Sequence, residues 1–151
     1  MANTQAMCTS FKTELLTATH NFGTAPTRGS GTADTFYGAL YLTSATLGAG
    51  TTAYTTSGEV SGPGYSAGGI AVTNATPPTS SGTTAYWTPS ASLVYTGVTL
   101  TTAFDTVLIY NQTQSNKAVS VHTFGSQTIT AGTFTLTMPA NTNTTALIRL
   151  A

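Results

Sequence analysis

The chain has 151 residues, of which four are basic and four are acidic, so that 5% are charged and the formal net charge is zero. Nucleic-acid binding requires a basic stripe, and four scattered Lys and Arg side chains exclude one. The lone cysteine, Cys8, excludes an intramolecular disulfide, and the absence of a Cys/His cluster excludes the usual zinc sites.

The low charge also indicates how the chain meets its surroundings. Soluble domains carry about 25% charged residues, so serine and threonine must hydrate this surface. Such a surface loses little desolvation free energy when a partner covers it, and zero net charge removes repulsion between copies. No window is apolar enough to span a bilayer, and no export signal is visible. We expect protein partners, including copies of the chain itself, and neither membrane nor nucleic acid.

The first predicted element is a helix over residues 4–22, in a single domain spanning 1–151. Its apolar residues recur at spacings of four, four, three and four, which is one helical stripe, and Gly23 ends it. The stripe consists of Met7, Phe11, Leu15, Ala18 and Phe22. Phe11 and Leu15 are candidate interface residues, because the helix either reaches onto a neighbour or covers a sheet of its own domain.

A linker is predicted over residues 23–34, which contain three glycines and a proline without any period. From residue 35 onward the sequence predicts β structure. Residues 36–42 are apolar on both faces, which is typical of a central strand or a strand at an interface. Tyr37 and Tyr41 share one of these faces and are further interface candidates.

Further strands are predicted from alternating or β-branched runs. They are 70–74, 85–88, 93–100, 106–110, 118–124, 127–130, 133–138 and 145–150. Turn signals at 111–116, 125–126, 131–132 and 139–143 indicate antiparallel hairpins. The predicted fold class is therefore mainly β, an antiparallel two-sheet sandwich or jelly roll over 35–151 with one N-terminal α-helix, and a flattened barrel is the alternative.

The segment 47–69 is too rich in glycine for a regular element. Long ordered loops usually carry a function, which here we expect to be contact with a neighbour; the alternative is a floppy loop. Glu59 in this loop is predicted to accept backbone N–H bonds and to pin the loop, and the alternative is a solvated charge. Glu59 and Tyr65 complete the candidate interface residues.

Residues that could carry catalysis are few. The stretch 64–68 matches the G-x-S-x-G pattern around a nucleophilic serine, but that motif needs a preceding strand and a following helix, whereas glycine and proline precede Ser66 and a strand-like run follows. His20 and His122 are not at ligand spacing and are expected to be structural. We expect no enzyme, no cofactor and no metal; a serine hydrolase using Ser66 is the least favoured alternative.

Three stretches carry a resemblance to a known class of proteins. They are Glu59–Tyr65, Phe104–Asn111 and Phe124–Gly132. In them, and from about Asp34 to the C-terminus, the chain resembles small virion proteins of tailed bacteriophages. In such proteins a Glu-hydrophobic-Ser/Thr-Gly-x-Gly-Tyr loop lies between strands of a compact β domain, and an arginine often follows the tyrosine. Ser66 stands at that place here, so the arginine's role is not transferred.

The resemblance implies a virion location, after assembly in the host cytoplasm. Together with the composition it favours a capsid decoration or cement protein, an oligomer (a trimer is favoured) that contacts the major capsid protein or other virion proteins. A tail, fibre or head-to-tail connector component is the alternative. A further alternative is a binding module whose exposed threonine and tyrosine loops attach to host-surface glycans.

Overall fold

The computed structural model describes residues 2–16, 18–22, 33–73 and 76–151. The predicted fold class is confirmed, with 46% strand, 5% helix, two antiparallel sheets and one short helix near the N-terminus. The elements are β1 (Ala6–Met7), α1 (Thr9–Leu16), β2 (Phe36–Leu42), β3 (Ile70–Ala71), β4 (Thr79–Ser81), β5 (Thr84–Trp87), β6 (Leu93–Asn111), β7 (Lys117–Leu136) and β8 (Ile148–Leu150).

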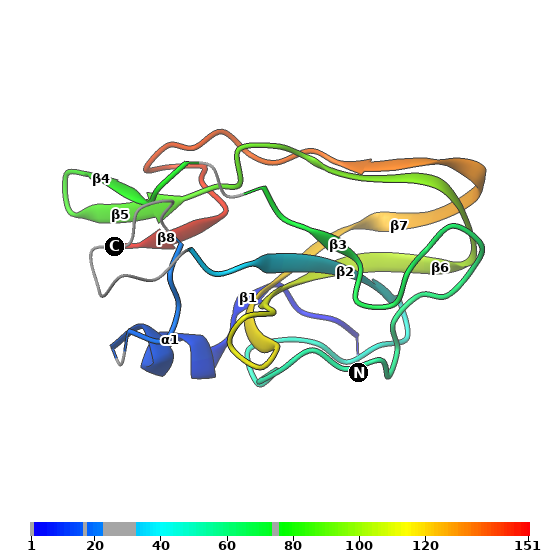
Figure 1. The fold of residues 1–151 in the computed structure, drawn as a ribbon, viewed down its shortest axis with the longest axis horizontal. Coiled ribbons are helices and arrows are strands. Elements are labelled where there is room, and N and C mark those ends of the chain that lie inside the picture. The colour runs from blue at the N-terminus through cyan, green and yellow to red at the C-terminus, as the bar shows by residue number, and fades with distance from the viewer. Residues whose placement is uncertain (1, 17, 23–32, 74–75) are drawn as a thin grey trace.

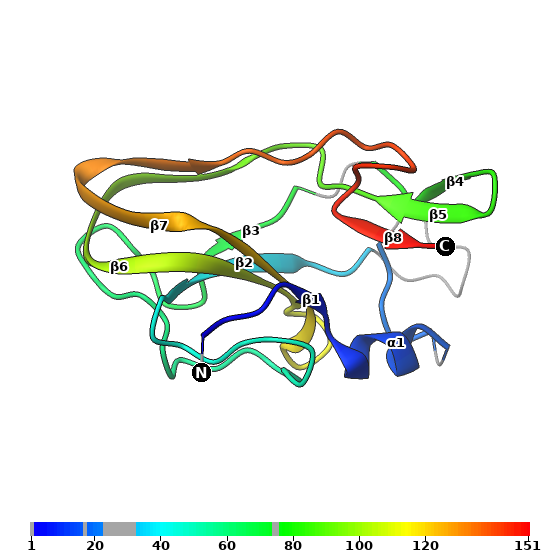
Figure 2. The same ribbon diagram turned by 180° about the vertical axis from the view of Figure 1, so that it is seen from behind.

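A long hairpin of β6 and β7 organises the molecule. It lies in a five-stranded sheet of order β1-β7-β6-β2-β3, and the second sheet has the order β4-β5-β8. The hairpin turn falls at 112–116, as predicted, where Ser115 and Asn116 adopt positive φ angles of 56° and 59°. The hairpin runs along one layer, curves at one end of the molecule and returns above as a second layer (Figures 1 and 2).

The predicted turns at 125–126 and 131–132 are wrong, because both lie inside β7. Similarly, the separate strands predicted on either side of residues 101–105 form one strand, β6. The pairing register between β6 and β7 shifts between Tyr95 and Thr106, and Gly97 and Ala131 have φ angles of 67° and 46°. Glycine and bulge residues therefore bend two continuous strands here instead of reversing the chain.

The predicted helix over 4–22 is too long, because α1 covers only Thr9–Leu16. Before it, β1 pairs with β7, and the N–H of Cys8 donates to the carbonyl of Val119. After it, Ala18 adopts a φ of 53°, which a continuing helix does not allow. Competing strand partners therefore shorten the helix. Most of the predicted linker, 23–32, lies outside the described residues.

The smaller strands also differ in extent from the predictions. The strand predicted over 145–150 begins only at Ile148, and the one over 70–74 is Ile70–Ala71, with residue 74 outside the described residues. β4 was not predicted, because its Thr-Ser-Ser sequence is exposed throughout and shows no alternation of apolar and polar residues. Within the described ranges, no helix has the length and apolar character that crossing a membrane requires.

The core lies between the two layers and beneath α1. Phe104, Phe124 and Phe134 fill the bend, with ring centroids 5.1 to 6.0 Å apart. At the other end, Phe22 stacks on Phe36 with centroids 4.4 Å apart. The contact of Phe22 with Phe36 and Trp87 packs the segment after α1 against the β layers.

Candidate functional site

Glu59 lies in a cluster of hydrogen-bond donors inside the 47–69 loop. It is 9% exposed, and its Oε2 accepts a hydrogen bond from the Tyr54 hydroxyl at 2.6 Å. Its Oε1 accepts bonds from the Tyr65 hydroxyl at 2.8 Å and from the Gly68 backbone N–H at 2.7 Å. The prediction that this carboxylate pins the loop is thus confirmed.

Further tyrosine hydroxyls join the loop to the sheet. The Tyr65 hydroxyl accepts the N–H of Leu40 in β2 at 3.0 Å while it donates to Glu59. The Tyr110 hydroxyl donates to the carbonyl of Gly68 at 2.9 Å, and the Tyr41 hydroxyl donates to that of Thr55. The loop is therefore a fixed part of the domain.

The electrostatics of this cluster keep the phenols neutral. Burial, and then the negative charge of Glu59, raise the pKa of Tyr65 far above its ordinary value. The same two causes, burial first, raise the pKa of Tyr110 to about 12, with a smaller contribution from Tyr37. These hydroxyls therefore stay protonated and act as hydrogen-bond donors at neutral pH.

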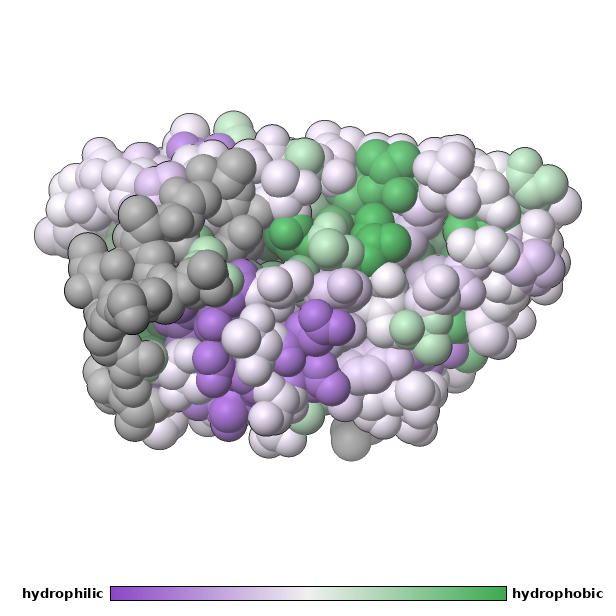
Figure 3. Space-filling model, viewed as in Figure 1, coloured by the Kyte–Doolittle hydropathy of each residue, from purple (hydrophilic) through white to green (hydrophobic). Residues whose placement is uncertain are grey.

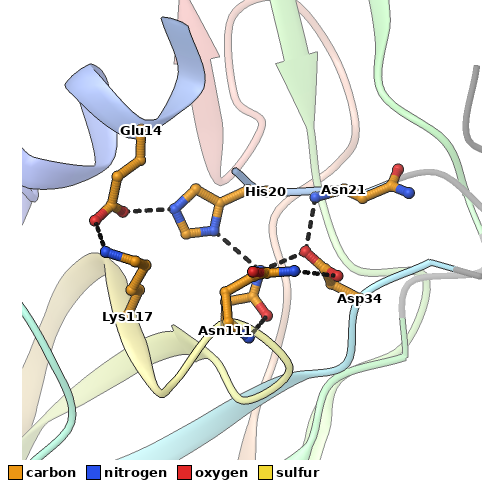
Figure 4. Close-up of polar contacts among 7 residues, drawn as sticks. Glu14, His20, Asn21, Asp34, Asn111 and Lys117 are labelled. Carbon is orange, nitrogen blue, oxygen red and sulfur yellow. Dashed lines mark hydrogen bonds and ion pairs between the residues drawn. The ribbon is translucent and has the colours of Figure 1, made fainter. Parts of the chain in front are cut away.

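A second cluster holds the segment after α1 against the hairpin (Figure 4). Glu14 accepts a hydrogen bond from Lys117 Nζ at 2.6 Å, and its other oxygen lies 2.7 Å from His20 Nε2. The other ring nitrogen of His20 lies 3.0 Å from the amide nitrogen of Asn111, and that amide donates to Asp34 Oδ2 at 2.7 Å. Two of the four carboxylates of the chain thus lie in one network.

The charges in this network stabilise one another. Burial alone would raise the pKa of Glu14, but hydrogen bonds and positive charge from Lys117 and His20 outweigh it, so the pKa lies below its ordinary value. A charged carboxylate beside an ammonium group is the arrangement that charge-assisted hydrogen bonds favour. The network therefore fixes segments that are 103 residues apart in sequence.

Sequence reasoning missed this network. His20 was expected at the end of a helix, whereas α1 ends at Leu16 and His20 lies beyond it. Asn111 and Asp34 carried no local signal, because they are 77 residues apart and meet only in the folded chain. Only a correct pairing of β2 with β6, which places Phe36 opposite Asn111, would have indicated their proximity.

The remaining side chains that could be reactive are His122, Cys8 and Ser66. His122 bonds to Ser120 at 2.8 Å, and burial lowers the pKa of His122 to about 4. Burial, followed by the charge of Glu14, raises the pKa of Cys8 to about 11, so the thiol stays protonated. Ser66 is followed by a turn and β3, and not by a helix. In the ranges that the structure describes, no group of three or more His, Cys, Asp or Glu side chains could hold a metal ion.

The predicted interface residues lie mostly inside the molecule. Phe11 and Tyr41 are 0% exposed, so their side chains are not available to a neighbour in this fold. Leu15, Tyr37 and Tyr65 are partly buried and pack against the core. The six residues do not form one patch. Glu59 and Tyr65 lie in the pinned loop, Tyr41 hydrogen-bonds to it, and Tyr37 lies beside Tyr110 on the sheet. Phe11 and Leu15 line an apolar pocket elsewhere.

That pocket lies between α1 and the three-stranded sheet and has a volume of about 110 Å³. Phe22, Trp87, Ile148 and Leu150 line its other sides. Its lining exposes no polar surface, and binding sites for small polar molecules need a few placed polar groups. It is therefore better suited to packing than to chemistry.

Comparisons with models of protein families, with curated proteins and with solved structures found no match to this chain.

Proposed function

We propose that the chain is a non-enzymatic structural subunit of a bacteriophage particle, and that it decorates and cements the capsid as a homo-oligomer. The observation that carries this proposal is the contrast between the inside and the outside of the domain. All four carboxylates accept hydrogen bonds within the fold, including Asp105, which accepts one from Asn3. The exposed residues are mostly hydroxyl, amide and glycine groups, with a few exposed cations such as Lys12 and Arg149 and two exposed large apolar side chains, Val94 and Leu150.

Figure 3 shows the hydropathy of one face of the outer surface. Strongly hydrophilic residues gather over α1 and the β6–β7 turn, and most of the remaining surface has the pale colour of intermediate hydropathy. Such a surface can be covered by a neighbour with little loss of hydration. These properties support a subunit that is surrounded by other proteins.

The pinned loop offers a rigid contact surface. Its residues 47–55 and Ser57, together with Ala2, Thr4 and Thr46, line a broad hollow, and Thr52, Ala53 and Thr55 are exposed there. A preorganised loop loses little conformational entropy on binding. If several such contacts form at once, their combined affinity exceeds that of any single contact by orders of magnitude, which is how a weakly binding subunit can stabilise a shell.

The same features suit a tail, fibre or head-to-tail connector component, which is the alternative position in the particle. The resemblance in the loop and the two hairpin strands supports a virion protein, but it does not favour a particular position in the particle. We favour the head, with the major capsid protein as partner and a trimer as the oligomer, because a small β domain with few charges and no net charge suits repeated contacts on a shell.

The test combines the mass of the purified chain, from light scattering, with its co-sedimentation with capsids that lack it. We expect a closed oligomer that binds these capsids and saturates at a fixed number of copies. Capsids that already carry the protein are the control and should take up no more. If the chain does not bind capsids that lack it, the decoration role is wrong. Binding to tails instead would assign the protein to the tail or connector.

A further inference from the structure

The upper layer of the sandwich has one covered edge and one open edge. On the β6 side, the segment 60–65 covers the edge, because the N–H of Thr99 donates to the carbonyl of Pro63 at 2.8 Å. On the β7 side, β1 pairs only with Ser120 and Val121. Among the described residues no strand pairs with the outer side of 123–136. The later part of this segment, after the bend, runs along the top of the molecule in both Figure 1 and Figure 2.

This open edge lacks most of the features that prevent strands from pairing between molecules. Natural edges carry charges, especially lysine, or proline. Residues 118–138 of this chain contain neither a charged residue nor a proline. The exposed side chains here are mainly hydroxyl groups, namely Thr123, Ser126, Thr128, Thr130, Thr133 and Thr135.

One bulge interrupts the edge and limits its length. Leu100 pairs with Ile129 and Val98 with Gly132, so β7 has one extra residue between these pairs. The N–H of Ala131 turns inward and donates to Thr99 Oγ1 at 3.0 Å. Two short stretches, 127–129 and 132–136, remain on either side of the bulge.

We infer that the outer edge of β7 over residues 127–136 pairs antiparallel with the same edge of a second copy of this chain. A two-fold axis places identical edges opposite each other, so the contact needs no other complementary surface. Threonine pairs across antiparallel strands are favourable, and an edge without charge does not repel its copy. The inference rests on the proposed role as an assembly subunit and adds a specific contact to it.

A two-fold contact through this edge constrains both the number of copies in the oligomer and the strength of their association. A two-fold contact gives an even number of copies, either a dimer or a pair of trimers. The contact is short, since it uses the two stretches beside the bulge, so self-association should depend on protein concentration.

The test introduces charge at the edge. The double variant Thr128→Lys/Thr133→Lys brings four positive charges together at the two-fold contact, which should weaken self-association roughly tenfold or more. The control, Thr83→Lys/Gln112→Lys, adds the same charge at the β4–β5 and β6–β7 turns. Light scattering over a dilution series should show half the wild-type mass for the edge variant and wild-type mass for the control. Urea midpoints of the variants establish that both fold.

The mass of the wild type and of the edge variant tests whether β7 edges pair. An edge variant that keeps the wild-type mass would overturn the inference, as would a wild-type chain that is a monomer or an odd oligomer at every concentration. Co-sedimentation with empty capsids separates this result from the proposed function. Edge-dependent pairing without capsid binding would leave the inference standing and remove the decoration role. Capsid binding by a chain whose mass is the same with and without the edge substitutions would overturn the inference and leave the decoration role standing.

Discussion

Glu59 is only 9% exposed, and three hydrogen-bond donors surround its carboxylate. A buried carboxylate without partners is costly, whereas two phenols and a backbone N–H replace the water that it loses. Tyr65 contributes to this arrangement twice, since its hydroxyl donates to Glu59 and accepts from Leu40. Removal of the Tyr65 hydroxyl would therefore break one hydrogen bond within the loop and one between the loop and β2.

We therefore expect Tyr65→Phe to lower the free energy of unfolding by about 1 to 3 kcal/mol, the usual effect of leaving buried polar groups without a partner. Urea denaturation measures this change. Tyr86→Phe is the matched control, because no hydrogen bond of the Tyr86 hydroxyl is found among the described residues, and its effect should be small. Equal effects of the two substitutions would contradict the role of Tyr65 in holding the loop.

His122 gives the fold a dependence on pH. Its pKa is about 4 in the folded chain, because burial disfavours the charged ring, and its ordinary value is 6.5. Between these values the unfolded chain binds more protons than the folded one. The contribution of His122 therefore lowers stability as the pH falls from 6.5 toward 4, by up to about 1.4 kcal/mol per pH unit.

The variant His122→Gln should lose this dependence, because glutamine does not titrate and can still bond to Ser120. We expect the free energy of unfolding to fall less between pH 7 and pH 5 in the variant than in the wild type, as measured by urea denaturation at each pH. Glu14 acts in a lower window, since its depressed pKa lies below 4.5. Identical pH profiles of the two proteins would show that His122 is not the group responsible.

Among the elements, the loop 60–65 depends on glycine for its approach to β6. A Cβ atom at Gly62 would lie 2.0 Å from the carbonyl oxygen of Thr99, which is backbone and cannot move aside easily. A Cβ atom at Gly50, in the same long loop, would meet nothing within 4 Å. An alanine at position 62 would therefore test a steric conflict with β6, whereas an alanine at position 50 would test only the loss of backbone flexibility.

Gly62→Ala should lower the free energy of unfolding by about 1 to 3 kcal/mol, as other overpacked sites do. Gly50→Ala should be close to neutral. Urea denaturation of both variants tests the pair, and hydrogen exchange at the N–H of Thr99 reports directly on whether the loop still covers β6. Protection of Thr99 unchanged in Gly62→Ala would show that the loop tolerates the extra carbon.

For the whole molecule, the distribution of charge predicts a weak response to salt. The chain has eight charged residues and no net charge, and its described ion pairs centre on Glu14. We expect the free energy of unfolding to change by less than about 0.5 kcal/mol between roughly 10 and 150 mM sodium chloride, although the Debye length falls from about 30 to about 8 Å. Thermal or urea unfolding at the two salt concentrations measures it, and a change of about 2 kcal/mol or more would indicate a larger electrostatic contribution.

Local sequence signals were enough to predict the β-rich class, a helix near the N-terminus, a hairpin turn within 111–116 and the part that Glu59 plays in its loop. These features depend on local properties: a period of two along strands, polar residues at a turn, and a lone acid among glycines. Neighbours in sequence supply such signals, so no knowledge of the fold is needed.

Only the tertiary structure decided that β6 and β7 bend continuously over the core, that the helix is eight residues long, and that His20, Asn111 and Lys117 meet. The glycines at 97, 125 and 132 permit either a turn or a bulge, and packing of Phe104 against Phe134 selects the bend. The helix is short because Ala6 and Met7 find partners in β7. Contacts between residues about a hundred positions apart have no local signature, because they form only when the two layers close over one core.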